Sequence, residues 1–292
     1  MPERFAFRDK EPRSSRGGLR LAGNDRSTSR RDEPDDSHVQ VMDRQSFVNM
    51  FADDYTPSHL TMIGPTQRGK TTLCFDLLRA VLARHKSEHW RVVFLHGKIK
   101  KRDHVMKDSA KADNYRIVKT WPPGMALRPK HWKRNVNGYI LRPLGNDKMS
   151  AAEEEKVLKR EFGKSIRTVY HSTRNVTITV VDERAQADKD LRLGKDLDAP
   201  LQRGLPHNPE WNNIQRGAWC SYHCYDAPEH IFLFVDDDDS NIDRYAEFGV
   251  GDPRVIKKVM GRLELKKVET GGTISQCLYM RRSDRFMCIV DT

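Results

Sequence analysis

One eight-residue segment restricts the fold of this chain more than any other feature. It reads Gly64-Pro65-Thr66-Gln67-Arg68-Gly69-Lys70-Thr71 and matches the pattern G-x-x-x-x-G-K-[ST]. The short apolar run 60–63 precedes it, and apolar residues at mostly helical spacing follow it between 73 and 82. This order of strand, glycine-rich loop and helix lets successive backbone N–H groups surround phosphate groups at the helix N-terminus. The segment therefore predicts a nucleotide-binding loop.

The side chains of the loop predict which ligands it holds. Lys70 is expected to reach the β- and γ-phosphates of ATP, and the Thr71 hydroxyl is expected to ligate Mg²⁺. The neighbouring Thr72 opens the helix and completes the predicted nucleotide contacts, which run from Gly64 to Thr72. We expect ATP and Mg²⁺ as cofactors.

A second motif indicates the type of reaction. The β-branched run 176–181 ends in the acidic pair Asp182-Glu183. A buried strand that ends in two acids is typical of P-loop ATP hydrolases, in which the first acid holds Mg²⁺ and the second polarises a water for attack on the γ-phosphate. A kinase needs no such base for water. A GTPase is disfavoured, because the sequence contains no Asn-Lys-x-Asp segment that would read guanine.

Composition limits the remaining possibilities. The 292 residues carry a formal charge of +11, which favours a polyanionic partner. No stretch approaches 18 consecutive apolar residues, so no membrane span is predicted. Five cysteines without framework spacing suit a reducing compartment, and we expect a bacterial cytoplasm or that of a phage-infected host.

The positive charge is concentrated between Lys98 and Arg134. This segment holds 12 Lys or Arg and three Asp, a net charge of +9. Its cations are interleaved with Trp121 and Trp132, so the segment is a candidate DNA-binding surface whose cations contact phosphates and whose aromatic rings stack on bases. A solvated basic face or a surface between subunits is the alternative interpretation.

Strand and helix patterns alternate along the chain and predict an α/β fold, a three-layer P-loop NTPase with a mostly parallel central sheet. Residues 1–38 are predicted to form a disordered tail, and residues 39–292 a single ATPase domain. Expected strands cover 60–63, 91–96, 115–119, 139–141, 176–181 and 230–235, with a terminal hairpin of 276–280 and 286–290. Expected helices follow Lys70, begin at the capping box Ser150–Glu153, and cover 240–248 and 253–263.

Three other segments carry weaker signals. Residues 208–214 contain Asn residues with Pro and Glu and are poor strand sequence. The residues Cys220, His223 and Cys224 can bind metals, but no second ligand pair at zinc-finger spacing lies nearby, so a zinc site is disfavoured. The acidic run 236–239 is expected to be a solvated loop after a strand.

The residues Gly64–Thr71, Asp182-Glu183 and Gln215-Arg216 together resemble the FtsK/HerA group of P-loop ATPases. More narrowly, the chain is similar to short ATPases of actinobacterial phages and mobile elements over roughly residues 55 to 292. The resemblance implies a ring-forming ATPase that moves or packages DNA. It also implies that Gln215 senses the γ-phosphate and that Arg216 or Arg203 acts as an arginine finger on a neighbouring subunit.

Two functions from different classes remain open at this stage. The first is an ATP-driven DNA motor, in which hydrolysis alternates strong and weak contact between DNA and the basic segment. The second is an ATP-dependent switch or assembly factor that acts on a protein partner without DNA. A small-molecule or nucleoside kinase is a third alternative, which Glu183 and the basic segment disfavour.

Overall fold

The computed structural model describes residues 34–97, 104–123, 136–143, 149–172, 175–216, 220–245, 248, 250–267 and 273–291. Within them, ten strands form one sheet in the order β1-β12-β11-β8-β2-β7-β6-β3-β5-β4. The strands are β1 (Gln40–Asp43), β2 (Leu60–Ile63), β3 (Arg91–Leu95), β4 (Tyr115–Val118), β5 (Gly138–Leu141), β6 (Thr177–Val181), β7 (Glu210–Ile214), β8 (His230–Phe234), β11 (Cys277–Arg281) and β12 (Phe286–Asp291).

The sheet is parallel except at β11, which pairs antiparallel with both β8 and β12. The strand β7 lies between β2 and β6 and pairs parallel with each. Parallel strands end at the same edge of a sheet. The loops that follow β2, β6 and β7 therefore all leave this one edge.

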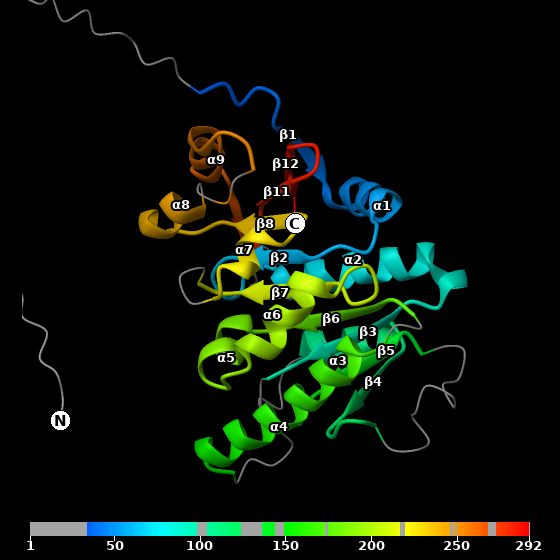
Figure 1. The fold of residues 1–292 in the computed structure, drawn as a ribbon. Helices are drawn as coiled ribbons and strands as arrows, with labels where there is room; N and C mark the ends of the chain where they lie inside the picture. Colours follow the sequence, from blue (N-terminus) through cyan, green and yellow to red (C-terminus); the bar gives the residue numbers. More distant parts are fainter. Residues whose placement is uncertain are drawn as a thin grey trace, which may run out of the picture. The chain divides into compact units, whose positions relative to one another are not determined.

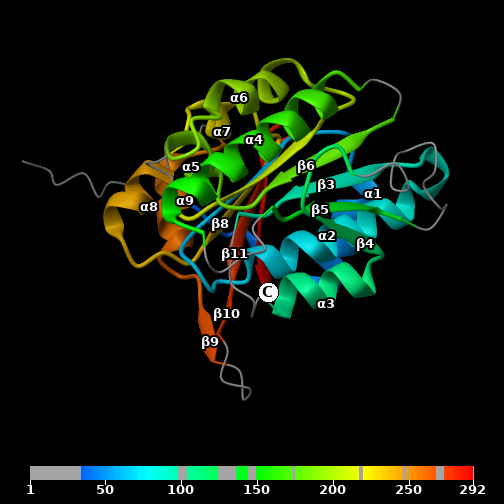
Figure 2. The same ribbon diagram turned by 90° about the horizontal axis from the view of Figure 1, so that it is seen from below.

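Helices cover both faces of the sheet (Figures 1 and 2). Those packed on one face are α1 (Arg44–Asp54), α2 (Lys70–Arg84) and α3 (His104–Ala112). Those on the other face are α4 (Ala151–Tyr170), α5 (Arg184–Lys189), α6 (Gly194–Arg203), α7 (His223–Asp226), α8 (Asp239–Tyr245) and α9 (Pro253–Met260). The predicted three-layer α/β fold with a mostly parallel sheet is confirmed.

Two minor elements complete the described structure. A short 3-10 helix, Lys86–Glu88, follows α2. The strands β9 (Leu265–Lys267) and β10 (Thr273–Ser275) pair antiparallel in a separate two-stranded sheet, which extends away from the helices in Figure 2.

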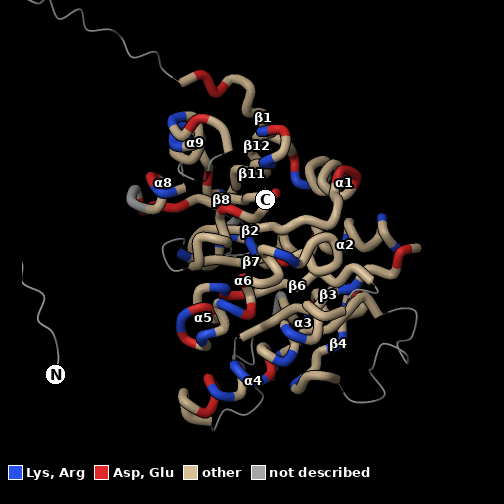
Figure 3. Tube along the Cα trace, in the orientation of Figure 1, with Lys and Arg blue, Asp and Glu red and all other residues tan. Residues whose placement is uncertain are grey.

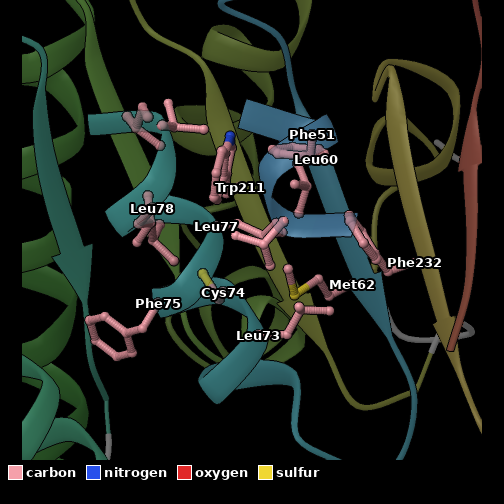
Figure 4. Close-up of a cluster of buried hydrophobic side chains, with 14 of the residues drawn as sticks. Phe51, Leu60, Met62, Leu73, Cys74, Phe75, Leu77, Leu78, Trp211 and Phe232 are labelled. Carbon is pink, nitrogen blue, oxygen red and sulfur yellow. The ribbon is translucent and has the colours of Figure 1, made fainter. Parts of the chain in front are cut away.

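The core follows the alternation of side chains along the buried strands. Leu60 and Met62 of β2 contact the cluster under α1 and α2, whereas Ile63 belongs to the cluster on the opposite face. Figure 4 shows Leu73 and Leu77 of α2 directed at this first cluster. Burial of α2 against β2 fixes the loop between them.

The strand β7 corrects the expectation that residues 208–214 are poor strand sequence. All five residues of Glu210–Ile214 are buried between β2 and β6. Each of the four polar side chains of this strand makes at least one internal hydrogen bond: Nε1 of Trp211, for example, donates to the Tyr55 hydroxyl at 3.0 Å. Tertiary hydrogen bonding therefore overrides low strand propensity here.

Other predicted elements are present with shifted ends. The capping box of Ser150 and Glu153 opens α4, and the terminal hairpin is β11–β12. The predicted helix 240–248 is present as α8 over Asp239–Tyr245, its next two residues lie outside the described part of the chain, and α9 ends at Met260. The sequence did not predict β1, α1, α3, α5, α6, α7 or the β9–β10 sheet.

The folded unit includes a short segment that precedes β1. Residues 34–38 belong to the same unit as the sheet, because Asp36 forms ion pairs with Arg262 (2.6 Å) and Lys258 (3.1 Å). The rest of the predicted tail, residues 1–33, lies outside the described residues. In the part of the chain that is described, no helix is long and apolar enough to cross a membrane.

Candidate nucleotide-binding site

The loop that follows β2, the candidate phosphate-binding loop, has a backbone that its glycines determine. Gly64 has φ +148°, and a Cβ atom at this position would lie 2.7 Å from Cβ of Phe234 on β8, so only glycine fits. The N–H of Gly64 donates to the carbonyl of Ile214 at 3.1 Å, which joins the loop to the end of β7. Gln67 and Gly69 also adopt positive φ angles, of 62° and 92°. Successive turns of this kind are the backbone geometry in which N–H groups can converge on an anion.

Lys70 begins α2 and is folded back into the loop. Its side-chain ammonium donates to the carbonyl of Gly64 and, at 2.5 Å, to that of Pro65. The residue is buried. Thr66, Gln67 and Thr72 are exposed, as a loop that wraps a ligand requires, and Thr71 is half-buried.

A second contact joins the loop to the segment after β8. The Arg68 guanidinium pairs with Asp237 at 2.9 Å. The neighbouring Asp236 is buried and accepts hydrogen bonds from Asn241 (3.1 Å) and the Tyr245 hydroxyl (2.7 Å). The expectation of a solvated acidic loop is therefore wrong for Asp236, which is buried and bonded to α8, whereas Asp237 and Asp238 are exposed as expected.

The carboxylate of Asp182, at the end of β6, is buried and oriented by two neighbouring strands. Nδ1 of His96 lies 2.9 Å from its Oδ2, and Nδ2 of Asn213 donates to its Oδ1 at 3.4 Å. A carboxylate has about four lone-pair sites, so one that is oriented by hydrogen bonds can also serve as a cation ligand. Oxygen donors such as this carboxylate and the Thr71 hydroxyl fit Mg²⁺. The sequence analysis missed His96, whose only signal is its place directly after a buried strand.

Glu183 separates β6 from α5 and has a left-handed backbone, with φ 66° and ψ 56°. A non-glycine residue adopts this conformation at some cost, and such residues are concentrated at functional sites. Its side chain is half-buried, unlike that of Asp182. The turn thus directs two consecutive acids into different environments.

Behind the acidic pair lies a buried charge cluster, which consists of Arg184 and its partners. The guanidinium donates to Asp188 (2.8 Å), Asp198 (2.7 Å), Glu210 and Asn212 (3.3 Å). Burial raises the pKa of Glu210 to about 7, against the opposing effect of Arg184. Burial alone would lower the pKa of Arg184, but the surrounding carboxylates raise it above its ordinary value. One cation therefore ties α5, α6 and β7 together.

The sensor and finger candidates follow β7 and α6. Gln215 is half-buried and Arg216 is exposed, at the same sheet edge as the phosphate-binding loop. Arg203 ends α6 and is exposed. The structure thus brings Gln215 to the edge shared with Asp182, because β7 pairs with β6. The roles of these three residues remain predictions.

Two stretches of the basic segment, residues 98–103 and 124–134, lie outside the described residues, and they carry eight of its 12 Lys or Arg. In its described part, the exposed cations lie on α3 and at the edge strand β4 (Figure 3); they are Lys107, Lys111, Arg116 and Lys119. Trp121 corrects one expectation. It is buried and packs edge-on against Tyr139 at 6.0 Å, so it cannot stack on a base.

No protein-family model and no curated protein match this sequence. Solved structures do match. The genome packaging NTPase B204 of Sulfolobus turreted icosahedral virus 2, in complex with AMPPCP, is 11% identical over 80% of this chain and 98% of its own, with a TM-score of 0.50. The sulfate complex of the same NTPase is 10% identical over 80% of this chain and 95% of its own, with a TM-score of 0.53. The DNA-packaging ATPase B204 of Sulfolobus turreted icosahedral virus is 11% identical over 80% of this chain and 97% of its own, with a TM-score of 0.51. The chain has the fold of these NTPases.

Proposed function

We propose that this chain binds and hydrolyses ATP. One observation carries the proposal: the phosphate-binding loop, the acidic pair Asp182-Glu183 and Gln215 follow three adjacent parallel strands at one edge of the sheet. A P-loop hydrolase needs a phosphate cradle, a metal ligand and a base for water within one site. The match in fold to NTPases solved with AMPPCP supports the same conclusion.

Each residue has a role that its position allows. Lys70 would exchange the carbonyls of Gly64 and Pro65 for the β- and γ-phosphate oxygens. Thr71 and Asp182 would hold Mg²⁺, with the carboxylate kept in place by His96 and Asn213. When bound, Mg²⁺ neutralises charge on the phosphates.

Glu183 would accept the proton of the attacking water. Gln215, at the end of β7, would sense the γ-phosphate. Arg216 is exposed, as a residue that reaches the nucleotide of a neighbouring subunit must be, and a ring of subunits would supply that neighbour.

We further propose that hydrolysis drives DNA translocation or packaging. The chain shares its fold with a DNA-packaging ATPase, and the described part of the basic segment places four exposed cations on α3 and at β4. Such cations contact phosphates without reading sequence. The alternative is an ATP-dependent switch that acts on a protein partner, which is favoured by the burial of Trp121 because this predicted base-stacking group is inaccessible to DNA.

The test is the rate of ATP hydrolysis with and without double-stranded DNA. A motor is stimulated by DNA, whereas a switch is not. Charge reversal at Lys100, Lys101 and Arg102 should weaken DNA binding for every sequence. For each phosphate that these residues no longer neutralise, the slope of log-affinity against log-salt should become shallower by about 0.9. Reversal of the exposed Lys156 and Lys159 on α4 is the control for two charge reversals outside the basic segment, and it is compared with the double reversal at Lys100 and Lys101.

Two results separate the proposals. If ATP is hydrolysed but wild-type protein shows no salt-dependent DNA binding, the motor is refuted and the switch is favoured. If no ATP is hydrolysed under any condition, the hydrolase itself is refuted.

A further inference from the structure

Outside the nucleotide site, three metal-ligating groups from distant parts of the chain converge. A carboxylate oxygen of Asp188 and the Sγ atoms of Cys220 and Cys224 all lie within 4.8 Å of one another. Cys224 is buried, and the other two are half-buried. Both cysteines are free thiols. The sequence analysis disfavoured zinc here because it found no further ligand nearby, whereas the fold supplies Asp188 from α5.

The surrounding hydrogen bonds orient Asp188 toward the thiols. Its Oδ1 accepts from Nε of Arg184 at 2.8 Å, and its Oδ2 accepts from the N–H of Ser221 at 3.2 Å. Each oxygen keeps a lone pair for a cation. The Ser221 hydroxyl also donates to Asp198 at 3.1 Å, which fixes the turn between the two cysteines. Outer contacts of this kind hold metal ligands in place.

From the sequence alone, His223 is the natural candidate for a third ligand, because it lies between the two cysteines. Its Nε2 instead lies 2.6 Å from Nε2 of Gln202 on α6. The three-dimensional ligand set is therefore two cysteines and an aspartate, and this histidine packs against α6.

We propose that Asp188, Cys220 and Cys224 bind one Zn²⁺ ion. Two thiolates with one carboxylate are soft enough to favour Zn²⁺ over Mg²⁺ or Ca²⁺. In a tetrahedral site with Zn–S bonds of about 2.3 Å, the sulfurs lie roughly 3.8 Å apart. The observed convergence needs little closure to reach that spacing, and water takes the fourth position.

Metal binding leaves the charge of this pocket unchanged. Zn²⁺ forms two Zn–S bonds and displaces one proton from each thiol, and both protons leave to solvent. The contact between Asp188 and Arg184 at 2.8 Å is compatible with this binding, because it engages only Oδ1. The Arg184 charge cluster therefore does not need to rearrange.

The ion would join two segments that adjoin the nucleotide site. Asp188 lies on α5, which begins directly after Glu183, and the cysteines follow Gln215 and Arg216 in the chain. We infer a positioning role, in which an ion with three protein ligands and one open position holds the backbone behind the acidic pair against the segment behind the sensor. This site does not depend on whether the protein hydrolyses ATP.

The test uses full-length protein prepared under reducing conditions. Bound zinc is measured directly, and metal-free protein is titrated with Co²⁺ alone, whose thiolate-to-cobalt absorption reports sulfur ligands. We expect one equivalent of metal and a thermal transition that rises with added Zn²⁺. Cys220→Ser, at a half-buried position, should lower metal affinity by more than the roughly 10–100-fold that loss of an outer contact costs. Cys288→Ala, in the buried strand β12, is the matched control and should leave metal binding unchanged.

Three outcomes would overturn the proposal. The first is the absence of thiolate-to-cobalt absorption in reduced wild-type protein. The second is unchanged metal affinity in Cys220→Ser. The third is a Cys220–Cys224 disulfide that, once reduced, yields thiols that take up no metal, because the pair would then be a redox couple.

Discussion

Removal of the buried cation Arg184 is the most demanding test of this fold. The substitution Arg184→Met keeps a side chain of similar length but takes away the cation at the centre of the Arg184 charge cluster. Asp188, Asp198 and Glu210 then lose their shared partner, and their side chains are 9%, 22% and 0% exposed. Water cannot replace the guanidinium at Glu210.

The expected cost follows from this burial. Removal of one partner from a buried ion pair destabilises a protein by about 3–5 kcal/mol, because the remaining charge is left without compensation. At about 2–4 °C per kcal/mol for a chain of this size class, the melting temperature should fall by about 6–20 °C. The loss should be smaller at pH 5 than at pH 8, because protonation neutralises the carboxylates that Arg184 no longer pairs with.

Thermal unfolding followed by circular dichroism measures the effect. The control is Lys195→Met, which removes a cation from α6 that lies outside the cluster and should shift the melting temperature by little. Glu210→Gln in the Arg184→Met background should recover part of the loss, since it removes one of the orphaned charges. If Arg184→Met melts within the range of the control, the reasoning about the Arg184 charge cluster is refuted.

Three further outcomes are expected. Lys70→Ala should largely abolish ATP binding, as measured by fluorescence titration. Arg68, the other cation of the loop, pairs with Asp237 and does not replace the contact with the β- and γ-phosphates. Wild-type affinity in this variant would contradict the loop assignment. Glu183→Gln should keep nucleotide affinity while hydrolysis falls about 10²–10⁴-fold, and a normal rate would place the base elsewhere. Burial raises the pKa of Glu210 from 4.5 to about 7, so its stabilising protonation is complete below pH 4.5 and lost as the pH rises through 7. The melting temperature of wild type should therefore decline over that interval relative to Glu210→Gln, and parallel curves would exclude the shift.

The sequence predicted the elements that local pattern specifies. The run 60–63 forms β2, and the residues after Lys70 form α2. Both segments place apolar side chains on the face that they bury, so their hydrophobic periodicity locates them in the sequence. The run 176–181 before Asp182 is β-branched throughout, and its residues 177–181 form the fully buried strand β6. These segments contain both the phosphate-binding loop and the acidic pair, so the centre of the candidate site could be located from the chain alone.

The rest depends on contacts between distant residues. The polar strand β7 is stable because Glu210 and Asn212 bond to Arg184 and because Asn213 bonds to Asp182, and none of these partners is near in sequence. Trp121 looked like a base-stacking residue beside cations, yet the cluster beneath α4 buries it. His96 and Asp188 likewise acquire their partners only when the strands and helices come together.

The composition of β7 also has a consequence for engineering. A library that seeks stability by raising strand propensity would replace Asn212 with valine or isoleucine. In this chain, replacement of Asn212 removes the oxygen that accepts from Arg184 at 3.3 Å. The same replacement at Asn213 removes the amide that donates to Asp182. Variants chosen by propensity at these two positions should therefore melt below the parent protein. In this strand, the residues that look least suited to a sheet are the ones that a designer should leave unchanged.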